Sequence, residues 1–183
     1  MAKQKRKLNQ FITLQLTSKG LTPTIWWSYL DQSGVKVLRG SYSARIDGKG
    51  RFKLPTAFRA LIEAKHGSSV FLTSVDGESV SVYPMPVWLE LEERVLARMA
   101  TTDPARQKFL DRVNYFGQAV EFDAQGRVMI PPRLREAAGM SGEVDVIGAI
   151  SHLQIWNHDR FAAKLQREPF TVDDSKRLSE SGI

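Results

Sequence analysis

The stretch Asp47-Gly-Lys-Gly-Arg-Phe-Lys-Leu-Pro-Thr-Ala-Phe-Arg59 is answered 76 positions later by Asp123-Ala-Gln-Gly-Arg-Val-Met-Ile-Pro-Pro-Arg-Leu-Arg135. Both copies fit the pattern D-x-x-G-R-h-x-h-P-x-x-h-R, in which h is apolar, and eight of the thirteen positions agree. A recurrence of this length indicates an internal duplication, which sets the architecture of a chain before any other feature is considered.

Each copy predicts a strand, a tight turn, a second strand and a short helix. The Asp can cap its own turn through its carboxylate, and the Gly supplies the positive φ that the turn needs. Alternating polar and apolar residues predict half-buried strands on both sides of the turn, and the Pro ends the second strand and opens a helix. In the two copies the strands are expected at 41–46, 51–54, 118–122 and 127–130, and the helices at 56–64 and 132–138.

The duplication continues beyond the helices. Further strands are expected at 69–72, 79–83, 144–147 and 152–156, with turns near Asp76-Gly77 and Gly148. A unit of about four strands and one helix is too small to bury a good core alone. The sequence therefore predicts either that two such units pack together or that they exchange strands.

A helical segment is expected between the two units, over about 87–113. Trp88, Leu91, Val95 and Met99 form one apolar helical stripe, and Asp103-Pro104 is a typical helix start. The second helix is expected to turn Phe109, Leu110 and Val113 inward. We interpret Trp88 and Phe109 as core residues rather than as parts of a binding site.

Several function classes are excluded or disfavoured by the composition. The chain has no cysteine, so thiolate chemistry and disulfides are excluded, and no apolar run approaches the roughly 20 residues of a membrane span. The three histidines lie apart without metal-ligand spacing, and His158-Asp159 is interpreted as a turn rather than a catalytic pair. Because no phosphate loop or nucleophile elbow is present, we expect no catalytic residue, no metal site, no cofactor, no small-molecule substrate and no enzyme activity.

The positive charge is concentrated locally. Of the net +6, residues 1–36 carry six Lys or Arg and one acid. Between positions 39 and 59 there are six basic residues and one acid, whereas 121–135 holds three Arg and two acids. A β-ribbon that carries Arg and Lys can read the major groove of DNA, and plain solvation of a basic strand face is the alternative. The first copy is therefore expected to dominate any DNA contact.

Two ordered stretches resemble the MraZ family of bacterial transcriptional regulators: 38–59, with the first copy, and 123–131, with the second. The link Tyr83-Pro-Met-Pro-Val-Trp88 also resembles that family, so the likeness covers about residues 38–165. The resemblance implies an α+β fold in which two pseudo-repeated SpoVT-AbrB swapped-hairpin units form a ring oligomer. The expected domains are 41–88 and 117–160, joined by a helical link at 89–116 and followed by a C-terminal helix or mobile tail at 161–183.

The same resemblance implies a cytoplasmic, nucleoid-associated DNA-binding protein. It would regulate, by repression, the division and cell-wall gene cluster that includes its own promoter, through G-rich direct repeats. The expected DNA-binding residues are Arg39, Arg45, Lys49, Arg51 and Lys53. For Asp47, Asp123 and Arg127 a structural role is favoured, in which each Asp holds the turn and braces its arginine.

Residues 1–36 have no counterpart in the family. One hypothesis is that translation starts at Val37 and the leader is an annotation error; a basic arm that adds nonspecific DNA affinity and a cleaved targeting peptide are the alternatives. The tail from about Arg167 is expected to be mobile or loosely helical. Rival functions are an AbrB-type antitoxin-like module that binds a partner through its tail, and a ring-forming structural protein.

Overall fold

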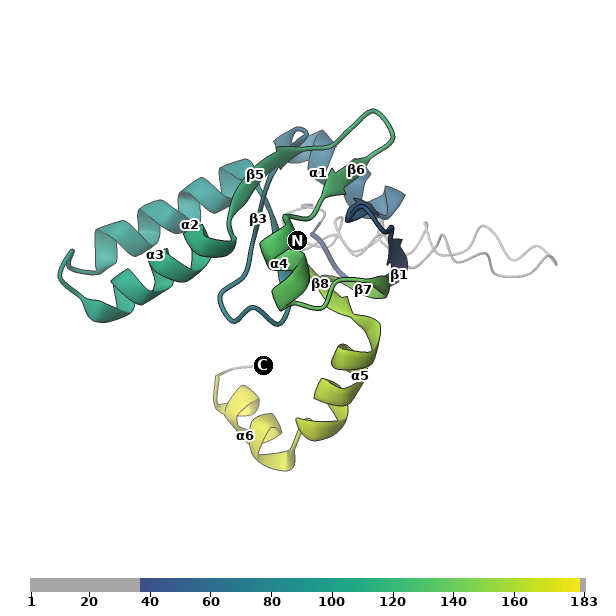
Figure 1. The fold of residues 1–183 in the computed structure, drawn as a ribbon. Helices are drawn as coiled ribbons and strands as arrows, with labels where there is room; N and C mark the ends of the chain where they lie inside the picture. Colours follow the sequence, from purple (N-terminus) through teal and green to yellow (C-terminus); the bar gives the residue numbers. More distant parts are fainter. Residues whose placement is uncertain (1–36, 182–183) are drawn as a thin grey trace, which may run out of the picture. The chain divides into compact units, whose positions relative to one another are not determined.

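A computed structural model describes residues 37–181 (Figure 1); the hypotheses about residues 1–36 lie outside this range. The first half of the duplication contains β1 (Ser41–Ile46), β2 (Arg51–Lys53), α1 (Thr56–His66), β3 (Ser69–Thr73) and β4 (Val80–Pro84). The second half contains β5 (Gln118–Glu121), β6 (Arg127–Met129), α4 (Pro132–Ala137), β7 (Gly142–Gly148) and β8 (Leu153–Asn157). The predicted order of strands and short helices is therefore confirmed, with ends that differ by one or two residues.

The two halves exchange strands within one antiparallel sheet of order β5-β3-β4-β8-β7-β1-β2-β6. The first strand of each half pairs with the third strand of the other, β1 with β7 and β5 with β3. The edge strands β5 and β6 are consecutive in the chain, and the amide of Asp123 donates to the carbonyl of Arg127 at 2.9 Å between them. The sheet is thus nearly closed, and of the two predicted arrangements strand exchange is the observed one.

The strand register has an internal two-fold symmetry. β2 pairs with its own equivalent β6 about Phe52 and Val128, so that Arg51 lies opposite Met129 and Lys53 opposite Arg127. β4 pairs with its equivalent β8 in the same way, about Ser81 and Gln154. Each position of one half can therefore be compared with a position in the other half that has nearly the same surroundings.

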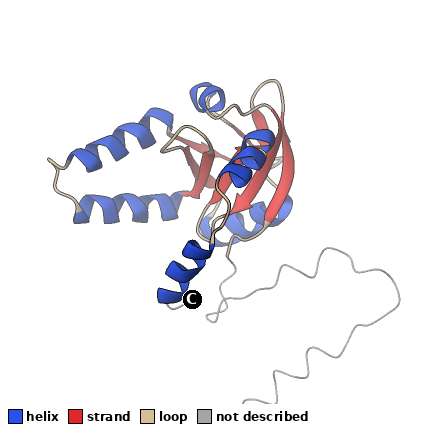
Figure 2. Cartoon of the chain, turned by 90° about the horizontal axis from the view of Figure 1, so that it is seen from below, coloured by secondary structure: helices blue, strands red, loops and turns tan. Residues whose placement is uncertain are grey.

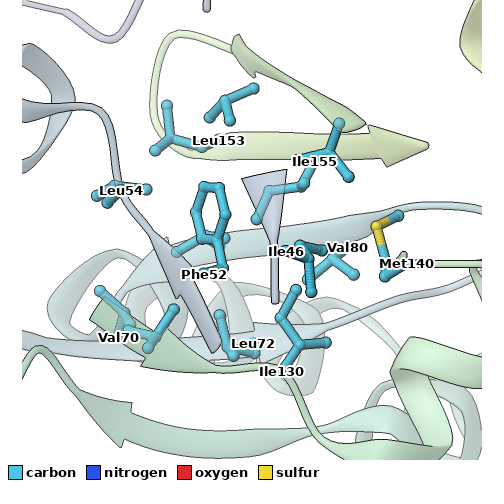
Figure 3. Close-up of a cluster of buried hydrophobic side chains, with 14 of the residues drawn as sticks. Ile46, Phe52, Leu54, Val70, Leu72, Val80, Ile130, Met140, Leu153 and Ile155 are labelled. Atoms are coloured by element: carbon cyan, nitrogen blue, oxygen red, sulfur yellow. The ribbon is translucent and has the colours of Figure 1, made fainter. Parts of the chain in front are cut away.

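Both halves supply the hydrophobic core (Figure 3). Phe52 is fully buried at the centre of the β2–β6 pair, and its equivalent Val128 is 3% exposed. The backbone ties the halves together beside them, because the amide of Leu54 donates to Gly126 and the amide of Ile130 donates to Gly50. The two turns of the repeated phrase are therefore held next to each other by the core.

Helices α2 (Met85–Arg98) and α3 (Pro104–Phe116) form the predicted link and extend away from the sheet as an antiparallel pair (Figure 2). Asp103 caps α3 by accepting from the amide of Ala105 at 2.8 Å. Trp88 is buried and stacks on Phe71 with the ring centres 4.5 Å apart, and Val113 is fully buried. The inward positions expected for Phe109 and Leu110 are only partly reached, since both remain half-buried.

The C-terminal segment forms α5 (His158–Arg167) and α6 (Val172–Glu180). The interpretation of His158-Asp159 as a turn is wrong: Asn157 caps α5 by accepting from the amide of Arg160, and His158 is the first residue of the helix. In the tail, Thr171 and Asp174 make a capping box at the start of α6. None of the helices in the described chain is both long and apolar enough to cross a bilayer.

Candidate nucleic-acid interface

The carboxylate of Asp47 organises the turn between β1 and β2. Its Oδ1 accepts from the backbone amides of Lys49 and Arg51 at 2.9 Å, and its Oδ2 accepts from Nε of Arg51 at 2.7 Å. Gly50 adopts φ +82°, in the left-handed region that a glycine tolerates without strain. This carboxylate therefore fixes both the turn and the base of the Arg51 guanidinium.

The turn between β5 and β6 repeats this arrangement with one looser bond. Asp123 Oδ1 accepts from the amides of Gln125 and Arg127 at 2.8 Å, and Gly126 has φ +72°. The distance from Arg127 Nε to Asp123 Oδ2 is 3.7 Å, which is an ion pair but too long for a hydrogen bond. These contacts agree with the structural role that was favoured for Asp47, Asp123 and Arg127. DNA contact by Arg51 stays a prediction.

Both aspartates are held in their charged form. The backbone amide of Arg51, followed by its side chain, lowers the pKa of Asp47 below the ordinary 3.8. The amide of Arg127 is the main cause of the lowered pKa of Asp123, and the charge of Arg51 contributes as well. The last effect shows that the two turns lie close enough to share an electrostatic environment.

The outer face of β1 and β2 carries the predicted cations. Ile46 pairs with Phe52, both buried, and extending that register by one residue places Arg45 beside Lys53 on the solvent side. Lys53 in turn lies opposite Arg127 of β6. With Lys49 and Arg51 also exposed, the cations of the first half form a surface that we name the basic ribbon: Arg45, Lys49, Arg51 and Lys53.

The second half lacks an equivalent basic face. The 76-residue offset makes Glu121 the counterpart of Arg45, Gln125 that of Lys49, and Met129 that of Lys53. Met129 is 54% exposed, in the outward orientation that Lys53 has on β2. The two halves therefore share a backbone but present different chemistry to solvent, which agrees with the expectation that the first half dominates.

Two of the predicted DNA-binding residues, Arg39 and Arg45, have surroundings that differ from those of the other three. Arg39 precedes β1 and lies at the opposite end of that strand from the turn, about 20 Å away at a rise of about 3.3 Å per residue. Arg45 lies at the turn end, but its partner across β1 and β7 is Glu143. The structure thus gathers Lys49, Arg51 and Lys53 and leaves Arg39 apart.

The final arginine of each phrase, which is not among the residues expected from the sequence to bind DNA, reaches the turn of the other half. Arg59 packs against Gly126, and Arg135 packs against Gly50, so that each covers the turn of the other half. The signal was present in the repeated pattern, where this arginine is invariant, but its reach across the duplication needed the strand exchange to be known.

The surface presents positive charge that can attract a polyanion. Over residues 37–181, no three His, Asp or Glu side chains converge as a metal site would require. His158 Nδ1 lies 2.9 Å from Asp145 Oδ2, and that hydrogen bond raises the pKa of His158. Asp145 lies opposite Ser43 of β1, two positions from Arg45. The chemical property that the site offers is positive charge on paired strands.

The fold and this surface define an internally duplicated, strand-exchanged α+β protein with a one-sided basic ribbon. Residues 117–180 match the family model described as "MraZ protein, putative antitoxin-like". A "Transcriptional regulator MraZ" from Acidobacterium capsulatum is 44% identical over 147 residues, which cover 80% of this chain and all of the relative.

Further relatives carry the same name. The protein from Koribacter versatilis is 43% identical over 80% of this chain and all of its own length, and that from Thermomicrobium roseum is 36% identical over 69% of this chain and 86% of its own. The chain belongs to the MraZ family. The names of these relatives support a role in transcription regulation.

Proposed function

We propose that the protein is a sequence-specific DNA-binding regulator that contacts its operator through the basic ribbon of the first half. The observation that carries this proposal is the one-sided charge of two halves with the same backbone. At three equivalent positions the first half has Arg45, Lys49 and Lys53, and the second half has no cation. Cations that the fold does not require, gathered on paired strands, suit a ligand that is a polyanion.

The ribbon offers hydrogen-bond donors that duplex DNA can accept. Two antiparallel strands fit the major groove, where an arginine can donate to the O6 and N7 of guanine while lysines contact phosphates. Lys49 and Lys53 are the phosphate contacts that we expect, and Arg51 is the base-reading candidate because Asp47 holds its Nε and leaves its remaining donors for the groove. Arg39 would meet phosphates further along the duplex.

The biological assignment follows from the family resemblance. It comprises repression of the division and cell-wall gene cluster, including the protein's own promoter, through G-rich direct repeats, in a cytoplasmic, nucleoid-associated protein. Blocking a promoter requires only that the protein occupies the DNA, and occupancy needs no catalytic group. Each half, 41–88 and 117–160, would be one SpoVT-AbrB unit, with 89–116 as the link and 161–183 as the tail.

Self-association into a ring is the second part of the proposal. Helices α5 and α6 have no buried residue, yet they carry apolar side chains, with Leu165 58% and Val172 74% exposed. Helices with an uncovered apolar face are typical of an interface. Several ribbons on one assembly would bind neighbouring repeats at high effective concentration, which compensates for the small contact of a single ribbon.

The direct test is a gel shift with DNA from immediately upstream of the protein's own gene and a scrambled fragment of equal length. Arg51→Ala is compared with Arg127→Ala, which removes the matching arginine of the other turn. Specific retardation that is lost in Arg51→Ala and kept in Arg127→Ala supports the proposal. Equal retardation of both fragments by the wild type, or equal loss in both variants, would contradict base reading by the first half.

The exposed tail also suits an antitoxin-like module that binds a partner protein. This alternative predicts that removing residues 161–181 abolishes partner capture and leaves DNA retardation intact. Under the ring proposal the same truncation lowers the assembly size measured by light scattering, and it weakens binding to DNA with several repeats more than binding to DNA with one.

A further inference from the structure

The last arginine of each repeated phrase crosses to the turn of the opposite half. A side-chain carbon added to Gly50 would lie 3.2 Å from Cδ and Cζ of Arg135, and one added to Gly126 would lie 2.7 Å from Cδ of Arg59. The glycines are therefore needed not only for their positive φ but also for the space that the arginines fill. The β1–β2 turn and the β5–β6 turn are thus each completed by an arginine from the opposite half.

The two crossing arginines differ in their ion pairs. Nε of Arg59 lies 2.8 Å from Oε1 of Glu63, one helical turn further along α1. The position equivalent to Glu63 is Gly139, which follows the end of the shorter helix α4 at Ala137. Within residues 37–181 no acid comes within ion-pair distance of Arg135, and its neighbour Glu136 points elsewhere because adjacent helical residues do not face each other.

This difference adds to the asymmetry of the ribbon. The arginine without an acid covers the turn that contains Lys49 and Arg51, and the neutralised arginine covers the turn that contains Gln125 and Arg127. Two differences on the strands, one in the turn and a helix shorter by more than one turn all increase the positive charge on the same side. A fold that needed the arginine only for packing would not need the acid removed at one of the two sites.

We infer that Arg135, from the second half of the chain, is a phosphate-binding residue of the DNA surface formed by the first half. This inference rests on the proposed function and deepens it. The stem of Arg135 is held against Gly50, so its guanidinium loses less conformational freedom on binding than that of an unconstrained surface arginine. A planar guanidinium can then donate two hydrogen bonds to one phosphate.

The test compares Arg135→Gln with Arg59→Gln by fluorescence anisotropy on the upstream DNA fragment between 50 and 200 mM salt. One lost phosphate contact makes the slope of log affinity against log salt less steep by about 0.9. When salt rises over this range, the fall in affinity should therefore be about 3-fold smaller for Arg135→Gln than for wild type. Arg59→Gln should keep the wild-type slope, and Arg135→Lys should recover most of it. Equal slopes for Arg135→Gln and wild type would overturn the inference.

Two controls separate the possible failures. If Arg135→Gln lowers the thermal midpoint and the affinity but leaves the salt slope unchanged, the residue is only structural and the inference is wrong. If the wild type does not bind the upstream fragment, or if Lys49→Gln leaves the slope unchanged, the proposed function fails and the inference fails with it. If Lys49→Gln lowers the slope and Arg135→Gln does not, the proposed function stands without Arg135.

Discussion

The basic ribbon can be removed with residues that the protein itself uses at the equivalent positions. In the double variant Lys49→Gln, Lys53→Met the first half would carry the residue types of Gln125 and Met129. Both lysines are exposed, and β2 pairs with β6 about Phe52 and Val128, so neither change reaches the core. We therefore expect the free energy of unfolding to stay within about 0.5 kcal/mol of wild type, as is usual for surface substitutions.

The effect on DNA binding can be given a size. Each lysine that neutralises a phosphate contributes about 0.9 to the slope of log affinity against log salt, so two lysines contribute about 1.8. When salt rises fourfold, from about 50 to about 200 mM, the wild type should lose about 12-fold more affinity than the variant. Anisotropy titrations of a labelled upstream fragment at four or five salt concentrations would measure the slope directly.

A charge-matched control decides whether the ribbon or the net charge is responsible. Lys108→Gln with Lys176→Gln removes the same two charges from α3 and α6, outside the sheet. This control should keep the wild-type slope. If it lowers the slope as much as the ribbon variant does, binding responds to overall charge, and the assignment of Lys49 and Lys53 as phosphate contacts is refuted.

Three further predictions concern the fold. Phe52→Ala removes a fully buried ring and should lower the free energy of unfolding by about 3–5 kcal/mol in urea titrations; a loss below about 1 kcal/mol would show that the β2–β6 centre is not the core. Gly126→Ala puts a methyl group at φ +72° and against Arg59 and should cost about 1–2 kcal/mol or more by the same measurement, whereas a neutral result would refute the close approach. The bond to Asp145 raises the pKa of His158 above the ordinary 6.5, so its stabilisation is full below pH 6.5 and is lost as pH rises through the raised value; thermal midpoints of His158→Gln should therefore approach those of wild type at high pH, and a constant difference from pH 5 to 9 would contradict the pair.

Local features of the fold could be predicted from the sequence because their causes are local. The Asp-x-x-Gly turn needs one carboxylate and one positive φ, and Asp103-Pro104 marks a helix start without help from the rest of the chain. The exchange of strands remained one of two possibilities, because pairing of β1 with β7 joins residues about a hundred positions apart, and no local pattern encodes that choice. The expectation for Phe109 failed for a related reason: its half-buried position depends on the tertiary arrangement of α3, which extends away from the sheet.

In the candidate site too, some features follow from local spacing and others depend on the strand exchange. Exposure of Arg51 and Lys53 on one strand face followed from their spacing, because side chains two apart share a face. The contribution of Arg135 could not be found from spacing, since it reaches Gly50 only across the strand exchange. Likewise, Glu143 beside Arg45 is a neighbour that only the register of β1 and β7 reveals.

The internal symmetry also bears on how DNA would be oriented. Positions that are identical in both halves, such as Asp47 and Asp123, make the same turn contacts and are accounted for by the fold. The cations that differ all lie on one side of the pseudo-two-fold axis through Phe52 and Val128, so the surface has a polarity that a symmetric ribbon would lack. If subunits form a ring, rotation carries each ribbon to the next in the same sense, and neighbouring ribbons must read DNA sites that run in the same direction. If two neighbouring DNA sites were inverted, one of them would face the side of the sheet that carries Glu121 and Met129. A phosphate of that site would then meet the Glu121 carboxylate, which repels it.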